Sequence, residues 1–181
     1  MDKKVKGIII IAFALLLPVI IIANYDAVKA YDWSSLGYVG IFIVMFLTSA
    51  TVILPLPGLA VATVAGAVAN PILIGISGGI GSALGEIIGY LTGYGGSQII
   101  NGNNVKEYEK IRKMLTEKDR TFIMLFLFSL IPNPLFDVAG IIAGSIKYPA
   151  WKFFLACALG KIIKITIFAY LGYLTISSFL F

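Results

Sequence analysis

At 181 residues the chain is long enough for one compact domain, yet 59% of its residues are hydrophobic and only 13% are charged. Soluble domains carry about 25% charged residues, so this composition excludes a soluble globular protein and indicates an integral membrane protein. The absence of histidine and the single cysteine exclude Ser-His-Asp and Cys-His catalysis, histidine-bound zinc and an internal disulfide. The net charge of +5 fits cytoplasmic loops and anionic headgroups, so we expect no nucleic-acid partner, no metal and no cofactor.

The first predicted element is a membrane span. Residues 7–23 form an unbroken apolar run after three lysines, about the length needed to cross the hydrocarbon core. A signal peptide is the alternative, but the run is long, contains Pro18 and lacks a small-x-small cleavage site. We therefore expect residues 1–35 to form a retained N-terminal transmembrane helix and a short outer loop.

A Pro-x-Pro tripeptide interrupts an apolar stretch twice, as Pro55-Leu56-Pro57 and as Pro132-Asn133-Pro134. A proline inside a membrane helix removes a backbone donor and clashes with the preceding turn, so the chain should turn at each site, within protein. Two ordinary proline kinks are the alternative reading. Matched positions at offsets of 77 to 79 residues favour a duplicated unit instead: Gly66 with Gly144, Pro71 with Pro149, and Gly93-Tyr94 with Gly172-Tyr173.

The segments around the second tripeptide are too short to cross a bilayer. Residues 121–131 would make about 16 Å of helix, against a hydrocarbon core of about 30 Å, and residues 135–146 are equally short. Two half-length helices that meet at the prolines predict a re-entrant hairpin. By the repeat, the segment that ends at Leu54 and residues 58–69 predict a first hairpin.

A long apolar helix is predicted after each hairpin, over residues 71–100 and 149–179. With a cytoplasmic N-terminus, the basic residues gather inside: three before the first span, six between 106 and 120, and Lys147 and Lys152, which makes eleven of the 14. If the first hairpin were a full span, the group of six would lie outside, against the positive-inside rule. The expected fold class is therefore an all-α integral membrane protein, an inverted repeat of a re-entrant helical hairpin plus a long transmembrane helix, as in secondary transporters.

The predicted organisation is an N-terminal helix and loop in residues 1–35, followed by one membrane domain in residues 36–181. The domain divides into repeat one (36–100), a connector (101–120) and repeat two (121–181). The connector carries apolar residues at helical spacing, opposed by Lys and Glu, which fits an amphipathic helix on the inner membrane surface or a solvated linker helix. We expect a prokaryotic cell membrane and a cytoplasmic N-terminus.

Glycines are frequent in the helix predicted after Pro71, where they would permit close approach of neighbouring backbones. They fall largely on one broad face of that helix: Gly75, Gly78, Gly79, Gly81, Gly85, Gly89 and Gly93.

Four ionisable residues stand within apolar sequence: Glu86, Asp137, Lys161 and Lys164. Each would cost at least about 2.5 kcal/mol in lipid, so each should face protein or water. Glu86 and Lys161 lie at similar depths in the two long helices and Asp137 lies just past a hairpin tip, so we expect the charges to converge where the tips meet. They either neutralise one another to hold the halves together, or line a polar crevice that accepts a lipid headgroup or relays a proton.

Asn133, between two prolines, adds an amide that can satisfy freed backbone groups or contact a ligand. The predicted substrate or ion pathway is Glu86, Asn133, Asp137, Lys161 and Lys164, and the predicted hairpin breaks are Pro55, Pro57, Pro132 and Pro134.

The run Ile131-Pro132-Asn133-Pro134-Leu135-Phe136-Asp137-Val138-Ala139-Gly140, followed by Pro149-x-Trp151-x-Phe153-Phe154 and Gly160-Lys161, resembles the signature of the eukaryotic vacuole membrane protein family. The stretch Gly79-Ile80-Gly81-Ser82-Ala83-Leu84-Gly85-Glu86 resembles that family's other block. Both blocks belong to the wider DedA or VTT-domain superfamily, of the SNARE-associated type, and the resemblance covers roughly residues 50–175.

The resemblance implies a VTT fold with two re-entrant hairpins, and it implies lipid movement. The vacuole members are associated with phospholipid scrambling, and the bacterial DedA relatives with polyprenyl-phosphate translocation and proton-dependent transport. The bacterial pattern has an acidic residue in the first hairpin and two arginines in the second, where this chain has Leu59, Ser129 and Leu135. The scramblase-like branch is therefore favoured.

The leading hypothesis is an energy-independent phospholipid scramblase or translocator that uses a polar crevice between two opposed hairpins. The main alternative is a proton- or ion-coupled secondary transporter, for example of polyprenyl phosphate. An intramembrane hydrolase with Glu86 and Asp137 as a carboxylate dyad lacks any recognised motif, so we expect no enzyme; a scaffold role stays open. The expected partners are membrane phospholipids or polyprenyl phosphate, and a homo-oligomer is left open.

Overall fold

The computed structural model describes residue 8 and residues 37–50, 58–96, 120–132 and 135–180. Within these ranges the chain is helical, with short connections and no strand. The predicted N-terminal span, the first Pro-x-Pro, Asn133, Pro134 and residues 101–119 of the connector lie outside the described residues. The helices of the described part are α3 (Gly37–Ala50), α4 (Gly58–Val68), α5 (Pro71–Gly96), α7 (Thr121–Leu130), α8 (Leu135–Ser145) and α9 (Ala150–Leu180).

The helices fall into two length classes. α5 has 26 residues and α9 has 31, and both are long and apolar enough to cross a membrane. α3, α4, α7 and α8 have 14, 11, 10 and 11 residues, which gives about 15 to 21 Å at 1.5 Å per residue, short of a hydrocarbon core of about 30 Å. The described chain is therefore all-α and has the composition and helix lengths of an integral membrane protein.

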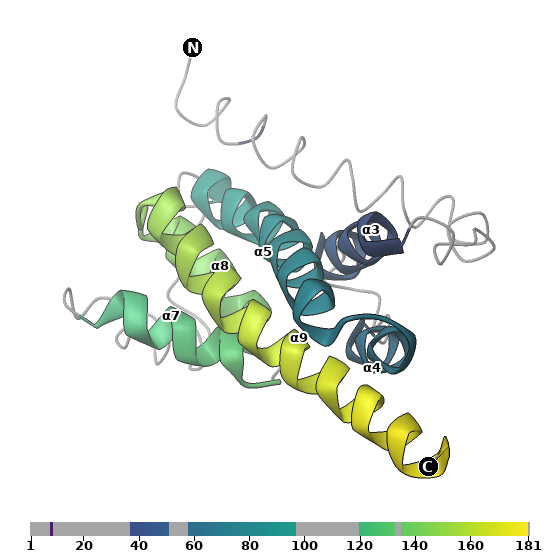
Figure 1. Ribbon diagram of the computed structural model, residues 1–181. Coiled ribbons are helices and arrows are strands. Elements are labelled where there is room, and N and C mark those ends of the chain that lie inside the picture. The colour runs from purple at the N-terminus through teal and green to yellow at the C-terminus, as the bar shows by residue number, and fades with distance from the viewer. Residues whose placement is uncertain (1–7, 9–36, 51–57, 97–119, 133–134, 181) are drawn as a thin grey trace.

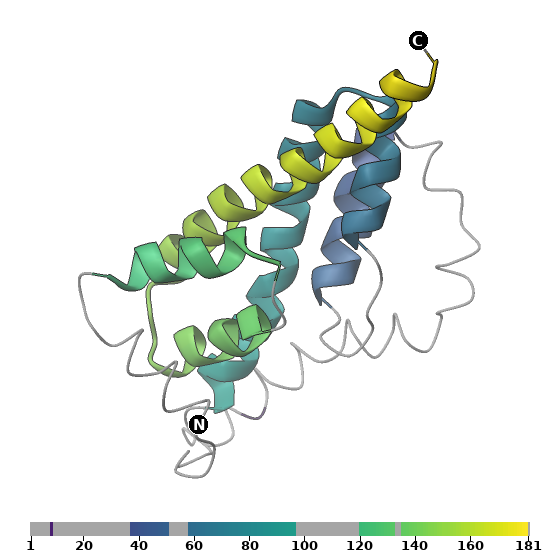
Figure 2. The ribbon, with the colours of Figure 1, turned by 90° about the horizontal axis from the view of Figure 1, so that it is seen from below.

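The two long helices form the centre of the molecule (Figures 1 and 2). Gly75 of α5 lies against Thr166 of α9, and Gly79 lies against Ile162, so numbers rise along one helix as they fall along the other. The pair is therefore antiparallel. The turn between α4 and α5 lies at one end of this pair, and the turn between α8 and α9 lies at the other.

Each pair of short helices divides its contacts between the two long helices. α3 packs on α5 and α7 packs on α9, whereas α4 packs on α9 and α8 packs on α5. Helices from the two halves of the chain are thus interleaved, and neither half is packed on itself alone.

Buried apolar side chains form two separate clusters. The larger lies among α5, α7, α8 and α9 and includes the rings of Tyr90, Phe136 and Phe153. The smaller contains Met45, Ala62, Ile74, Ile165 and Ala169. The bulkier core therefore lies beside α7 and α8.

Glycines set the closest backbone approaches. A Cβ at Gly93 would lie 1.8 Å from the carbonyl oxygen of Ile141, and one at Gly85 would lie 2.5 Å from that of Phe46. The glycines of α5 thus lie against α9, α3 and α8. At 3.6 residues per turn they share one broad face of α5, as predicted, and three neighbouring helices can approach that face because it lacks side chains.

The turn into α9 ends α8 with a Schellman motif. The Lys147 amide donates to the carbonyl of Gly144 (2.9 Å), and the Tyr148 amide donates to that of Ala143 (2.9 Å). Lys147 has a φ of 57°, the left-handed conformation that this motif requires. Pro149 follows and prevents the helix from continuing, so the chain reverses within a few residues.

Gly93→Ala should destabilise the protein by about 1–3 kcal/mol, because its new methyl group would meet the Ile141 carbonyl on a rigid helix. Gly89→Ala is the matched control one turn earlier in α5, where nothing lies within 4 Å of the added Cβ. Thermal unfolding of both variants in detergent checks this. Equal melting temperatures for the two variants would show that α8 does not lie against α5 at this point.

Candidate functional site

A buried lysine stands at the centre of the molecule. Lys161 of α9 is 5% exposed, and its ammonium group donates to Glu86 Oε1 at 2.6 Å and to Ser82 Oγ at 2.7 Å. A third, longer hydrogen bond of 3.3 Å reaches Ser49 Oγ. An ammonium has three donors, so these three acceptors satisfy it completely.

Three helices bring these groups together. Ser82 and Glu86 lie one turn apart on α5, Lys161 comes from α9 and Ser49 from α3. α3 can approach because Gly81 and Gly85 offer it no side chain, and a Cβ at Gly81 would lie 2.3 Å from the Phe42 carbonyl oxygen. The two hydroxyls also share a short hydrogen bond of 2.5 Å, so Ser49 and Ser82 form one polar group beneath the ammonium.

Apolar residues of α8 cover the ion pair. The ring of Phe136 lies 5.3 Å from Lys161 Nζ and is itself buried. Gly140 leaves room for the Glu86 carboxylate, whose Oε2 would lie 3.9 Å from a Cβ at that position. The pair is therefore enclosed in a setting of low dielectric, where removal of one partner would strand an unpaired charge.

Asp137 and Lys164 lie at the edge of this enclosed pair. Both are partly exposed, and both interact electrostatically with Glu86 and Lys161. Among the described residues neither has a hydrogen bond or ion pair, and the two do not form a salt bridge with each other. The site therefore holds one neutralised pair and, beside it, one partly exposed carboxylate and one partly exposed ammonium without an ion-pair partner among the described residues.

The structure thus brings four of the five predicted pathway residues into one electrostatic cluster: Glu86, Asp137, Lys161 and Lys164. Asn133 lies outside the described residues, as do the predicted breaks Pro55, Pro57 and Pro134. The remaining break, Pro132, is exposed and follows the end of α7 at Leu130, after Ile131 in extended conformation.

Sequence reasoning missed Ser49 and Ser82, which are two of the three acceptors of Lys161. The spacing of Ser82 and Glu86, one helical turn apart, was a usable signal, because it puts a hydroxyl and a carboxylate on the same face of α5. Ser49 offered no such signal, since its role depends on how α3 packs against α5.

The packing around Ser129 bears on the arginine that the resemblance to the bacterial DedA pattern implies at this position. Ser129 is fully buried in α7 and donates hydrogen bonds to the carbonyls of Phe126 (2.8 Å) and Ala156 (3.2 Å). A Cβ at Gly160 would lie 1.9 Å from its oxygen, so α9 runs directly over the position. An arginine has no room here without separation of the two helices.

Replacement of Lys161 alone should destabilise the protein far more than replacement of Lys161 together with Glu86. Lys161→Met leaves the Glu86 carboxylate buried and unpaired, which should cost about 3–5 kcal/mol of stability. The double variant Glu86→Gln/Lys161→Met should regain most of that loss, and the exposed Lys152→Met serves as a control without effect. Unfolding in detergent measures all three; a double variant as unstable as the single one would contradict the enclosed pair.

Comparison with known proteins agrees with the predicted resemblance. The VTT domain family matches residues 56–174. The chain is 38% identical over 65 residues to vacuole membrane protein KMS2 of Arabidopsis thaliana, which is 35% of this chain and 16% of that protein. It is 43% identical over 53 residues to KMS1 of the same plant (29% of this chain, 13% of that protein), and 52% identical over 40 residues to the vacuole membrane protein 1 homolog of Dictyostelium discoideum (22% and 10%).

The matched segments thus span less than a fifth of each of these relatives, and no solved structure matches the chain significantly. The family match covers α5, most of α9 and both members of the Glu86–Lys161 pair, and it confirms the resemblance drawn from the Pro-Asn-Pro and Gly-Lys blocks. This chain is an integral membrane protein that belongs to the VTT domain family.

Proposed function

We propose that this protein is an energy-independent phospholipid scramblase, built as an inverted repeat of two re-entrant hairpins with a polar crevice between them. The observation that carries the proposal is the pair of partly exposed, unpaired charges Asp137 and Lys164 beside the enclosed Glu86–Lys161 pair. Phospholipid headgroups carry a phosphate, and many also carry an amine, so one anionic and one cationic contact suit them.

Reciprocal glycine contacts support the inverted repeat. A two-fold relation requires that each contact between the halves recurs with the roles of the halves exchanged. Two such pairs of contacts occur at the repeat offset of 78 or 79 residues: Gly66 against Ala169 with Gly144 against Tyr90, and Gly93 against Ile141 with Gly172 against Thr63.

Helix lengths and the antiparallel central pair support the opposed hairpins. α3 with α4, and α7 with α8, are pairs of short helices that precede a long one, and none of the four is long enough to span the hydrocarbon core. The turns after α4 and after α8 lie at opposite ends of the α5–α9 pair, so the two hairpins would open toward opposite sides of the membrane. The basic residues favour a cytoplasmic side for Lys147 and for the N-terminus.

In the proposed pathway, headgroups move past the Glu86–Lys161 ion pair. Glu86 and Lys161 cancel each other, so a polar group enters without meeting a bare buried charge. Asp137 and Lys164 then replace part of the water that a headgroup loses, while the acyl chains stay in the surrounding lipid. Phospholipids are the proposed partners.

The match to vacuole membrane proteins lends no support to the expected prokaryotic cell membrane.

A proton-coupled carrier, for example of polyprenyl phosphate, is the alternative that one observation favours. Asp137 has no ion-pair partner among the described residues, so it can exchange a proton without breaking a salt bridge. The hydrolase hypothesis gains no such support. The Glu86 carboxylate is bound to Lys161, and no hydrogen bond joins it to Asp137 in the described part of the chain.

A dithionite quenching assay on liposomes with fluorescent-headgroup phospholipids tests the proposal. The wild-type protein should take quenching beyond the outer-leaflet half, with no dependence on an imposed pH gradient. Asp137→Asn and Lys164→Gln should each slow the exchange about tenfold or more, because a hydrogen bond to a charged group contributes about 1.5–3 kcal/mol. Lys152→Gln, an exposed lysine at the start of α9, should scramble at the wild-type rate.

Three outcomes separate the candidates. Quenching that stops at half with the wild-type protein would sink the scramblase. Exchange that needs a pH gradient, and loses this need in Asp137→Asn, would favour the coupled carrier. Equal losses of exchange rate in Lys152→Gln and Lys164→Gln would mean that headgroups do not pass through the charge cluster.

A further inference from the structure

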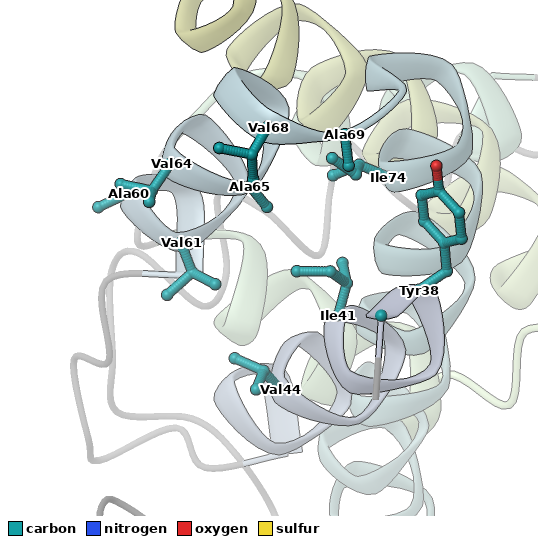
Figure 3. A pocket seen from close by; sticks show the side chains of 11 residues that line it. Tyr38, Ile41, Val44, Ala60, Val61, Val64, Ala65, Val68, Ala69 and Ile74 are labelled. Carbon is teal, nitrogen blue, oxygen red and sulfur yellow. The ribbon is translucent and has the colours of Figure 1, made fainter. Parts of the chain in front are cut away.

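An apolar groove lies between α3 and α4, on the side of the first hairpin. It has a volume of about 580 Å³, within the range of roughly 300–1,000 Å³ that ligand sites occupy. Figure 3 shows that Ile41 and Val44 of α3 face Val61, Val64 and Ala65 of α4 across it. No charged side chain lines it among the described residues, and Tyr38 brings the sole hydroxyl of that lining, at one end.

The corresponding surface of the second hairpin is closed. Val64 is 70% exposed in the groove, whereas Ile142, its counterpart at an offset of 78 residues, is fully buried. Val61 and Ala65 are half-buried, and their counterparts Ala139 and Ala143 are fully buried. The same helix face is therefore covered in one half of the molecule and open in the other.

The difference in side-chain volume is large enough to matter. Beside the second hairpin, the ring of Phe153 packs against those of Tyr90 and Phe136, with centroids 5.2 and 6.5 Å apart. The equivalent positions beside the first hairpin carry smaller side chains: Ile74 for Phe153, Ala169 for Tyr90 and Gly58 for Phe136. Three aromatic rings that fill one hairpin have no equivalent in the other, so the first hairpin is left with apolar space.

A second hollow, lined by both apolar and polar groups, continues the groove at one end. It has a volume of about 510 Å³, shares Val68 and Ala69 with the groove, and is lined by Asn70 of the α4–α5 turn and by Tyr170 and Tyr173 of α9. The two tyrosine rings meet edge to face with centroids 6.4 Å apart, and both are exposed. Tyrosines beside the α4–α5 turn suit the level of the lipid headgroups.

We propose that this groove is a binding site for one bilayer lipid, whose acyl chain fills the space between α3 and α4. Its ester and headgroup region would lie against Asn70, Tyr170 and Tyr173. An apolar groove that runs into a hollow with amide and phenol groups matches the two ends of a lipid. Hydrocarbon chains are the molecules that surround an open apolar groove in a membrane. The comparison of the two halves rests on the inverted repeat of the proposed function. The site itself needs no transport activity, because the lipid stays bound and fills apolar space in the first hairpin.

Native mass spectrometry of the full chain, delipidated in detergent and titrated with dipalmitoyl phosphatidylcholine, tests the proposal. The wild-type protein should take up one lipid at low concentration, before further adducts appear. Ala65→Phe and Val64→Phe should each weaken that first adduct by about tenfold or more, because the new ring occupies the space of the chain. Val64 is exposed, so Val64→Phe should fold even if Ala65→Phe does not. Ile163→Phe, on an exposed position of α9, is the control and should bind like the wild-type protein.

An unchanged first adduct in both groove variants, or wild-type binding without a distinct first adduct, would overturn the lipid site. So would a different occupant. In a Cys157→Ser background, a disulfide-linked dimer through Val64→Cys would identify a second copy. If that cysteine is protected from maleimide, and cleavage after residue 35 removes the protection, the occupant of the groove is the N-terminal segment. The groove variants should scramble at the wild-type rate, so a failed dithionite assay with an intact first adduct would count against the proposed function alone.

Discussion

The ammonium group of Lys161 has to be neutralised inside a protein that is surrounded by hydrocarbon, and the arrangement of the helices follows from this demand. Its three acceptors come from α3 and α5, while Lys161 itself lies on α9, so the network forms only when these helices meet. A charge left unpaired at this depth would cost several kcal/mol, which makes separation of the halves unfavourable. Glycines make the meeting sterically possible, since they remove the side chains that would hold α3 and α9 away from α5.

The two halves are alike in connectivity and unlike in content. In both halves one short helix packs on the long helix of its own half and the other packs on the long helix of the other half. The second half contributes Lys161, Asp137 and the rings of Phe136 and Phe153, whereas the first contributes Glu86, two serines, the ring of Tyr90 and an open groove. In the proposed account, a duplicated scaffold gives each half a different task. Headgroups move past the charges near the centre, and the groove of the first hairpin binds an acyl chain of a resident lipid.

Local chemistry predicted much of this molecule. The prolines, charges and apolar runs predicted residues 121–131 and 58–69 as short helices, and α7 and α4 lie within those bounds. The cost of charge in lipid was enough to predict that Glu86 and Lys161 would meet. Packing between distant elements was not predictable in this way. That α4 lies on α9 rather than on α5, and that Ser49 reaches Lys161, depend on how whole helices fit together, which no periodicity in one segment records.

The opposed orientation of the two halves is the central claim, and the accessibility of single cysteines tests it most directly. In a Cys157→Ser background, Asn70→Cys marks the turn after α4 and Lys147→Cys marks the turn after α8. A membrane-impermeant maleimide should label one of these variants in sealed, oriented vesicles and the other only after the vesicles are opened. If both variants react from the same side, the halves share one orientation and the account is wrong.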